Sequence, residues 1–132
     1  MIDFFRECVT CIHNTDAACL QVMFKGLVTY DEFVEVSEYE FEMIRHYKLK
    51  KCFVNLREMS AYPTGGQDYV KNIWFPRVIK EGIQMLAFVV PDDIFVKVSM
   101  VEAHDPQGTL TIQYFDEENR ALAWLADSKF YI

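Results

Sequence analysis

The sequence has little positive charge. Its 13 lysines and arginines face 20 aspartates and glutamates, which gives a formal net charge of −7 and a pI of about 4.9. Proteins that bind nucleic acid need a basic surface to neutralise phosphates, and anionic membranes attract polybasic segments. The composition therefore argues against a nucleic-acid partner and against charge-driven binding to a membrane.

The sequence also lacks a long hydrophobic run. The most apolar stretch, residues 85–90, has the length of a strand, whereas a membrane-spanning helix needs about 20 apolar residues. The N-terminus carries Asp3 and Glu7 and has no basic region followed by an apolar one, as a signal peptide would have. We therefore expect a cytoplasmic protein with no membrane span.

Catalytic motifs are missing as well. The sequence contains no G-x-S-x-G, no P-loop and no G-x-G-x-x-G, which are the motifs of common hydrolase and nucleotide sites. The histidines His13, His46 and His104 lie far apart and do not form a ligand-spaced cluster. The sequence therefore predicts no metal, no cofactor and no enzyme activity.

One pair of carboxylates keeps a catalytic alternative open. Asp92 and Asp93 directly follow the apolar run at 85–90, and ligands of α/β proteins bind at the carboxyl ends of strands. An acid–base or metal role, shared with Arg57, requires these three side chains to converge. Capping of the next helix explains the two aspartates with fewer assumptions.

The four cysteines are Cys8, Cys11, Cys19 and Cys52, all within apolar, strand-like runs. Cys8 and Cys11 have C-x-x-C spacing, but residues three apart on a strand point to opposite faces. Their sulfurs would then diverge, which prevents a disulfide or shared metal ligation. We expect four reduced cysteines that serve as small core residues.

What the sequence does have is apolar content and clear periodicity. Hydrophobic residues make up 52% of the 132 residues, enough for a single domain, 1–132, with a substantial core. The pattern predicts an α/β domain around a mixed five-stranded sheet, in the element order β-β-α-β-α-β-α-β-α. Strands are expected at residues 4–13, 18–25, 51–56, 85–90 and 109–115. A short polar turn makes the first two an antiparallel hairpin.

The first predicted helix covers residues 29–47. Thr29 and Glu32 have the spacing of a capping box, in which each side chain bonds to the other's backbone amide. The side away from the apolar stripe is acidic, with glutamates at 32, 35, 38 and 42. This acidic side is either a docking face for a basic partner or an ordinary solvated helix face.

A second helix is expected after the third strand. Thr64 and Gln67 repeat the capping-box spacing, so the helix should begin immediately after Thr64. Pro76 cannot continue a helix undisturbed and pushes Phe75 out of helical geometry. We expect either a kink there or a second short helix over 76–81. Two further helices are predicted, at residues 92–100 and following Asp116.

Four segments resemble a known family. They are Phe-Val-Asn-Leu-Arg at 53–57, Trp-Phe-Pro-Arg at 74–77, Leu-Ala-Phe-Val-Val-Pro at 86–91 and Tyr-Phe-Asp at 114–116. With the order of elements, they make the chain similar to the SpoIIAA-like group of small bacterial proteins, of STAS/SEC14 type. The resemblance implies a single STAS/SpoIIAA-like domain and a role in regulation or protein interaction.

Antagonists of the STAS type carry an Asp-Ser-Ser-Gly run, and a kinase phosphorylates its second serine. In this sequence the run falls on Pro63, Thr64, Gly65 and Gly66, so glycine stands at the usual acceptor position. The resemblance therefore implies a module without the usual phosphorylatable serine. Thr64, or Ser60 in the preceding loop, is left as the candidate for phosphorylation.

The expected function is a non-catalytic module that binds an unknown protein partner. The residues expected at its partner or ligand edge are Arg57, Ser60, Tyr62, Thr64, Gly65, Gly66, Trp74, Phe75, Asp92 and Phe95. The SEC14 likeness leaves a small-molecule or lipid-binding domain as the alternative, with an apolar pocket near Trp74 that includes Met100. A homodimer is also open, since a hairpin edge and the apolar tail at 130–132 need cover.

Overall fold

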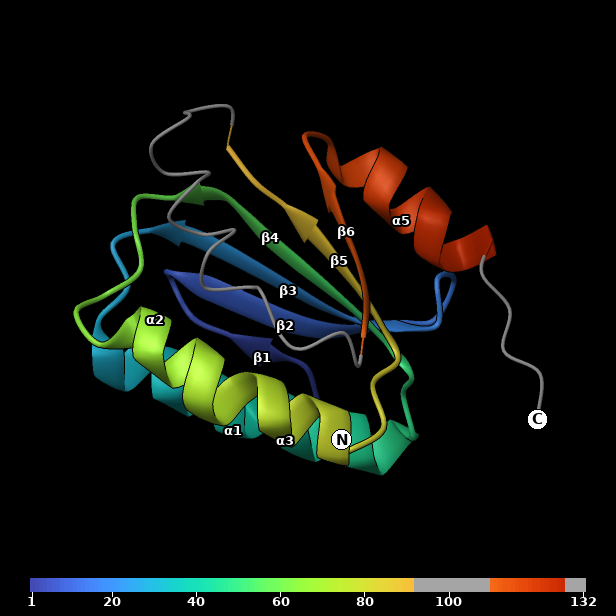
Figure 1. The fold of residues 1–132 in the computed structure, drawn as a ribbon, viewed down its shortest axis with the longest axis horizontal. Helices are drawn as coiled ribbons and strands as arrows, with labels where there is room; N and C mark the ends of the chain where they lie inside the picture. Colours follow the sequence, from blue (N-terminus) through green and yellow to red (C-terminus); the bar gives the residue numbers. More distant parts are fainter. Residues whose placement is uncertain (92–109, 128–132) are drawn as a thin grey trace.

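The computed structural model describes residues 1–91 and 110–127, and the predicted helix at 92–100 and the tail at 130–132 lie outside them. The chain forms a six-stranded sheet in which each strand neighbours the next in sequence (Figure 1). The first three strands pair antiparallel, and the third to the sixth pair parallel. The strands are β1 (Phe4–Phe5), β2 (Val9–Asn14), β3 (Cys19–Gly26), β4 (Lys51–Met59), β5 (Met85–Val89) and β6 (Thr111–Phe115).

The prediction of five strands is wrong because the first predicted strand is two. Arg6 donates its backbone N–H to the carbonyl of Val9 at 2.8 Å and closes a tight turn. Phe4 then pairs with Cys11 across the new hairpin. The consecutive burial of Cys8 and Val9 already breaks the alternation that a single strand requires.

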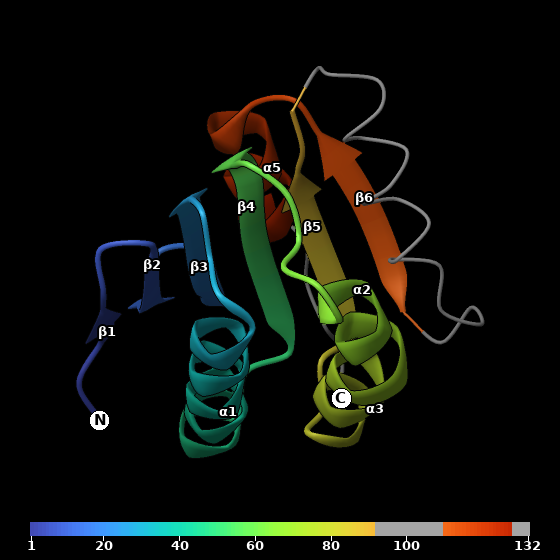
Figure 2. The same cartoon turned by 90° about the vertical axis from the view of Figure 1, so that its left-hand side faces the viewer.

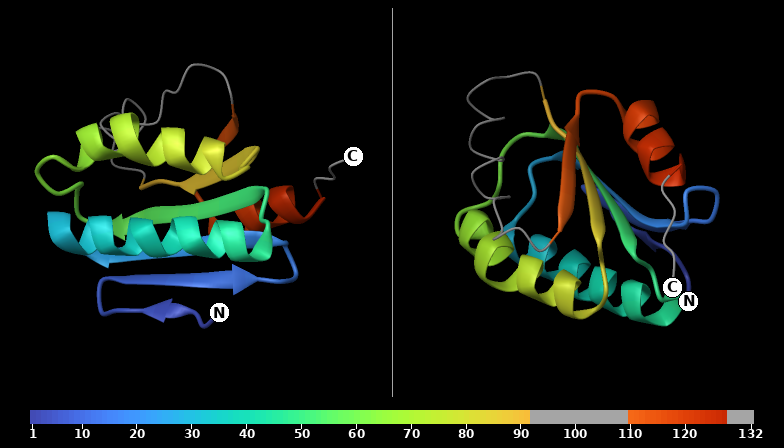
Figure 3. Two further views of the ribbon diagram at one scale, coloured as in Figure 1. Left: turned by 90° about the horizontal axis from the view of Figure 1, so that it is seen from below. Right: turned by 45° about the vertical axis from the view of Figure 1, so that its right-hand side comes forward.

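Helices cover both faces of the sheet. One face carries α1 (Tyr30–Tyr47) and a continuous helical segment made of α2 (Gly66–Tyr69), the π-helix η1 (Val70–Trp74) and α3 (Phe75–Lys80). The opposite face carries α5 (Glu118–Asp127), as Figures 2 and 3 show. The molecule is therefore a three-layer α/β domain. On the shared face of the sheet, α1 contacts α3.

The two faces have different cores. Under α1 and α3 lies a large cluster that includes the fully buried Phe41, Ile44 and Leu86. Under α5 lies a smaller one made mainly of short side chains around Phe53 and Leu125. Because aromatic side chains bury the most area, the face under α1 contributes most of the hydrophobic stabilisation.

The predicted capping box at the start of α1 is confirmed. Thr29 Oγ1 accepts from the amide of Glu32 at 3.2 Å, and Glu32 Oε1 accepts from the amide of Thr29 at 2.9 Å. The side chain of Glu32 also accepts from the Cys8 thiol at 3.4 Å. These bonds hold the pKa of the Glu32 carboxyl below its usual value, with the bond to the Thr29 amide contributing most.

The second predicted capping box is not formed. Gly66 donates its N–H to the carbonyl of Pro63 at 2.7 Å. Gly65, at φ 84° and ψ −8°, has the angles of the third residue of a type II turn. This turn makes Gly65 the N-cap of α2, one residue later than predicted, and glycine has no side chain with which to cap.

Pro76 does not displace Phe75, and α3 (Phe75–Lys80) matches the predicted short helix over 76–81 to within one residue at each end. Phe75 is helical, at φ −59° and ψ −49°, and its N–H bonds to the carbonyl of Val70 in the wider π spacing. Pro76 stands in the first turn of α3, where a missing N–H costs little. The change of spacing in η1 therefore absorbs the proline, and the expectation of a non-helical Phe75 is wrong.

All four cysteines are buried and unpaired, as predicted. Cys8 and Cys11 were expected to point to opposite faces of one strand. That expectation is wrong, because Cys8 precedes β2 and both thiols face α1. Cys8 reaches Glu32 and Cys11 reaches Met43, which are about 16 Å apart along a helix at 1.5 Å per residue. Burial raises the pKa of the Cys19 thiol to about 12, so that thiol stays protonated at neutral pH.

No helix in the described ranges, 1–91 and 110–127, is both long enough and apolar enough to cross a membrane.

Candidate functional site

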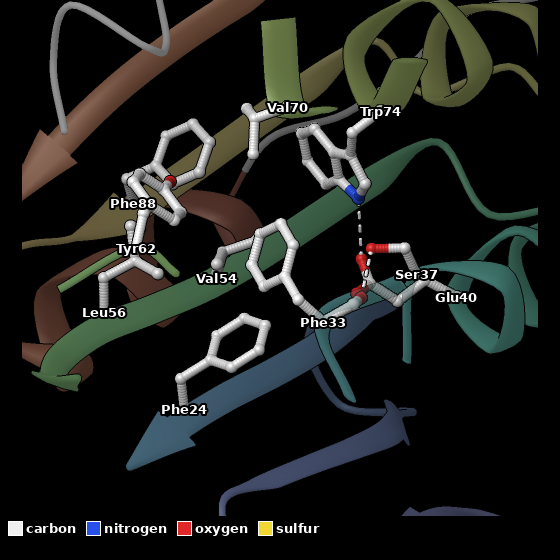
Figure 4. A pocket seen from close by; sticks show the side chains of 10 residues that line it. All are labelled: Phe24, Phe33, Ser37, Glu40, Val54, Leu56, Tyr62, Val70, Trp74 and Phe88. Carbon is white, nitrogen blue, oxygen red and sulfur yellow. Dashed lines mark hydrogen bonds between the residues drawn. The ribbon is translucent and has the colours of Figure 1, made fainter. Parts of the chain in front are cut away.

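A small cavity lies between the sheet, α1 and the segment that runs from α2 to α3 (Figure 4). Its volume of about 20 Å³ holds roughly one water molecule. Half of the ten lining residues are aromatic: Phe24, Phe33, Tyr62, Trp74 and Phe88. The others are Ser37, Glu40, Val54, Leu56 and Val70.

Glu40 is the one carboxylic acid among the described residues that line the cavity. It lies on the buried side of α1 with 2% of its surface exposed, and its Oε1 accepts from the indole N–H of Trp74 at 3.0 Å. Burial raises the pKa of the Glu40 carboxyl to about 8, although the Trp74 hydrogen bond acts in the other direction. The carboxyl is therefore mostly protonated at neutral pH.

Several further described polar groups near Glu40 are hydroxyls. Ser37 is 1% exposed, and its Oγ donates to the carbonyl of Phe33 at 2.8 Å. Burial raises the pKa of Tyr62 and that of Tyr69. For Tyr69, the nearby Ser37 hydroxyl lowers the pKa by a smaller amount, although no hydrogen bond of normal geometry joins the two.

Sequence reasoning missed Glu40, which was not among the glutamates assigned to the acidic side of the helix. A signal was present, because Val36, Glu40 and Ile44 follow one another at four-residue spacing. Residues four apart lie on one helix face, and Val36 and Ile44 are fully buried. A carboxylate in line with two core residues indicates a buried acid.

The loop that carries several residues of the predicted edge forms a surface groove of about 330 Å³. Tyr62, Thr64 and Gly65 all line it. Thr64 and Gly65 are exposed, whereas Gly66 is buried at the start of α2. Ser60 is exposed just before the groove, and its N–H donates to the carbonyl of Gly26 at 3.0 Å. Five predicted residues therefore lie within one loop.

The other predicted site residues do not join this edge. Arg57 is exposed, and its guanidinium donates to the carbonyl of Asp116 just before α5, on the opposite face of the sheet. Trp74 and Phe75 are buried in the core. Asp92 and Phe95 lie outside the described residues. The convergence of Arg57 with the two aspartates is therefore still a prediction.

The cavity also bears on the alternatives raised by the sequence. Trp74 and Tyr62 line it as expected, but pockets for drug-sized ligands measure about 300–1,000 Å³. The space that the described residues leave at Trp74 is far too small for a lipid. In the same described part of the chain, no three histidine, cysteine or acidic residues are placed to hold a metal ion.

Comparison with known proteins identifies the fold and the family. The SpoIIAA-like family pattern matches residues 19–126. A crystal structure of an uncharacterised DUF3478-family protein with a SpoIIAA-like fold, from Shewanella loihica PV-4, superposes with a TM-score of 0.57. It is 11% identical, and the match covers 89% of this chain and 91% of that one. No curated protein matches the chain.

Proposed function

Because the chain belongs to the SpoIIAA-like family, we propose that it is a non-catalytic module that binds a protein partner at the loop of residues 60–68. The observation that carries this proposal is the surface groove of about 330 Å³ that this loop forms. Conserved scaffolds present binding residues on loops between rigid elements. Here the loop connects the buried strand β4 to α2.

Contacts on both sides support a preformed loop. The ring of Tyr62 packs edge-on against Phe33 at 5.6 Å between centroids. Tyr30 packs edge-on against Tyr69 at 6.0 Å, and a Cβ on Gly65 would lie 3.3 Å from the Tyr30 ring. A loop held in this way loses little conformational entropy when a partner docks.

Phosphorylation would regulate the same edge. Thr64 is exposed at the type II turn, and Ser60 is exposed before it. A phosphate on Thr64 would add about −1.5 to −2 charges beside Asp68, which lines the same groove. The added negative charge would weaken docking of an acidic partner surface and strengthen docking of a basic one.

The test places a photo-cross-linking amino acid at Ala61, which is exposed in the groove. Thr111, exposed at the start of β6 and at the other end of the sheet, is the matched control position. We expect a discrete cross-linked protein from position 61 and none from position 111. Thr64→Glu should change that product several-fold, downward for an acidic partner surface and upward for a basic one, whereas Thr111→Glu should leave it unchanged.

A product of twice the chain mass would identify a second copy of this chain as the partner. Equal cross-linking from positions 61 and 111, or a yield unchanged by Thr64→Glu, would contradict the proposed edge.

A further inference from the structure

Glu40 is a buried acid without a basic partner in the described structure. Glutamate is rarely buried unless it is paired. The described arginines on the same side are engaged elsewhere, since Arg45 pairs with Glu81 and Arg77 with Glu38. Within residues 1–91 and 110–127, burial and the Trp74 hydrogen bond are the two influences on the pKa of Glu40. The carboxyl therefore lacks a counter-ion among the described residues.

The surroundings of Glu40 suit a small cation. The cavity beside it has room for a group about the size of a water molecule, and an ammonium group has nearly that size. Five aromatic side chains line the space, and the faces of aromatic rings attract cations. Ser37 adds a hydroxyl oxygen, which donates to Phe33 and can still accept.

We propose that this cavity binds the head group of a small primary amine, with Glu40 as the counter-ion. The ammonium donates hydrogen bonds to the Glu40 carboxylate and the Ser37 oxygen. The alkyl end points toward Tyr62, which lies at the far end of the lining from Glu40 (Figure 4). Tyr62 is half-buried and the other nine lining residues are buried, so we place the alkyl end on that side of the cavity.

Binding must release a proton. At neutral pH the reaction joins a protonated Glu40 and an ammonium ion, and it yields a carboxylate–ammonium pair plus one free proton. The titratable groups that face Glu40 are Cys11 of β2, Cys52 of β4, Tyr62 and Tyr69. Burial raises the pKa of all four, so they stay neutral and Glu40 supplies the proton.

A neutral ligand of the same size provides the decisive comparison. Methylammonium and methanol differ chiefly in charge, and only methylammonium should drive the proton from Glu40. We would titrate each into the full chain at pH 7 by calorimetry in two buffers of different ionisation enthalpy. We expect release of about one proton per methylammonium bound and none with methanol. Tetramethylammonium, which exceeds the cavity, should not bind.

Two variants locate the effect. Glu40→Gln keeps an oxygen that accepts from Trp74 but removes the charge, so we expect at least tenfold weaker methylammonium binding and no proton release. Glu42→Gln changes an exposed glutamate of the same helix and should behave as the unmodified chain. In the unmodified chain, methylammonium at about ten times the Kd of the carboxylate form should lower the apparent pKa of Glu40 by about one unit.

The inference fails if methylammonium does not bind, or if methanol binds as tightly as methylammonium. It also fails if methylammonium binds without releasing a proton, or if Glu40→Gln binds it as well as Glu42→Gln does. None of these outcomes depends on the protein-binding edge at residues 60–68.

Discussion

Two buried ionisable residues lie on opposite faces of the same sheet and are satisfied in different ways. Lys51 of β4 is 7% exposed and donates its ammonium group to the carbonyl of Leu125 near the end of α5. The C-terminal end of a helix favours a positive charge. Glu40 is 2% exposed and has one neutral indole as its described donor.

The contrast separates a buried residue with a structural role, Lys51, from a buried residue with a candidate functional role, Glu40. The carbonyl of Leu125 near the end of α5 accepts a hydrogen bond from Lys51, so the burial of Lys51 serves the packing of α5. Glu40 stays uncharged because nothing described on its own face compensates a charge. A buried acid of this kind lies more often at a functional site than an exposed one does, and Glu40 borders a cavity.

The largest effect should come from removing the tryptophan that holds Glu40. Trp74→Ala deletes a large buried side chain and the donor to the carboxyl, and we expect a loss of about 3 to 5 kcal/mol in the free energy of unfolding. Trp124, which is half-buried on α5, is the control, and Trp124→Ala should cost less than half as much. Urea unfolding of both variants gives the comparison, and equal losses would contradict it.

The pH dependence of stability should reveal Glu40 next. Its pKa is raised from 4.5 to about 8 in the native protein, so the native state holds a proton that the unfolded chain releases. Stability from Glu40 is therefore complete below pH 4.5 and falls by about 1.4 kcal/mol per pH unit toward pH 8. Glu40→Gln should flatten this slope, and Glu42→Gln should retain it. A slope that Glu40→Gln leaves unchanged would refute the assignment.

A smaller effect is expected on the other face. Lys51→Met removes the donor to the Leu125 carbonyl, and we expect a loss of about 1 to 3 kcal/mol. The exposed neighbour Lys50 is the matched control, and Lys50→Met should change stability by less than about 0.5 kcal/mol. Denaturant unfolding at pH 7 measures both losses. Similar losses for the two variants would contradict a stabilising role of the buried Lys51 hydrogen bond.

The smallest effect compares the two threonines that share a capping-box pattern. Thr29→Ala should cost about 1 kcal/mol, because its hydroxyl caps α1. Thr64→Ala should cost less than about 0.5 kcal/mol, because Gly65 and not Thr64 is the N-cap of α2. Thermal unfolding of the two variants checks the difference, and a Thr64→Ala loss as large as that of Thr29→Ala would contradict the turn.

Local signals in the sequence predicted the elements that local chemistry controls. The capping box at Thr29 and the apolar centre of β4 depend on near neighbours, and both are observed. The same pattern at Thr64 failed because the turn from Pro63 to Gly66 competes for the backbone, and Gly65 at the third position of that turn was its readable signal. The prediction that Phe75 leaves helical geometry was also wrong, since the wider hydrogen-bond spacing of η1 is set by packing rather than by composition.

In the candidate site, too, residues close together in the sequence were predicted and residues brought together by packing were not. Tyr62, Thr64 and Gly65 were predicted because they are contiguous in a loop. The cavity was not predicted, because Glu40 and Trp74 lie 34 residues apart and only the packing of α1 against η1 brings them together. The position of Glu40 on the apolar stripe was the one readable signal.

The measurement that tests the central claim most directly is the titration of the Glu40 carboxyl, followed by NMR in protein with ¹³C-labelled glutamate. Glu40→Gln identifies the resonance by its disappearance. We predict a midpoint near 8, because burial without a cation keeps the carboxyl protonated. A midpoint at or below 4.5, the ordinary value, would show a charged Glu40 at neutral pH and would contradict the account.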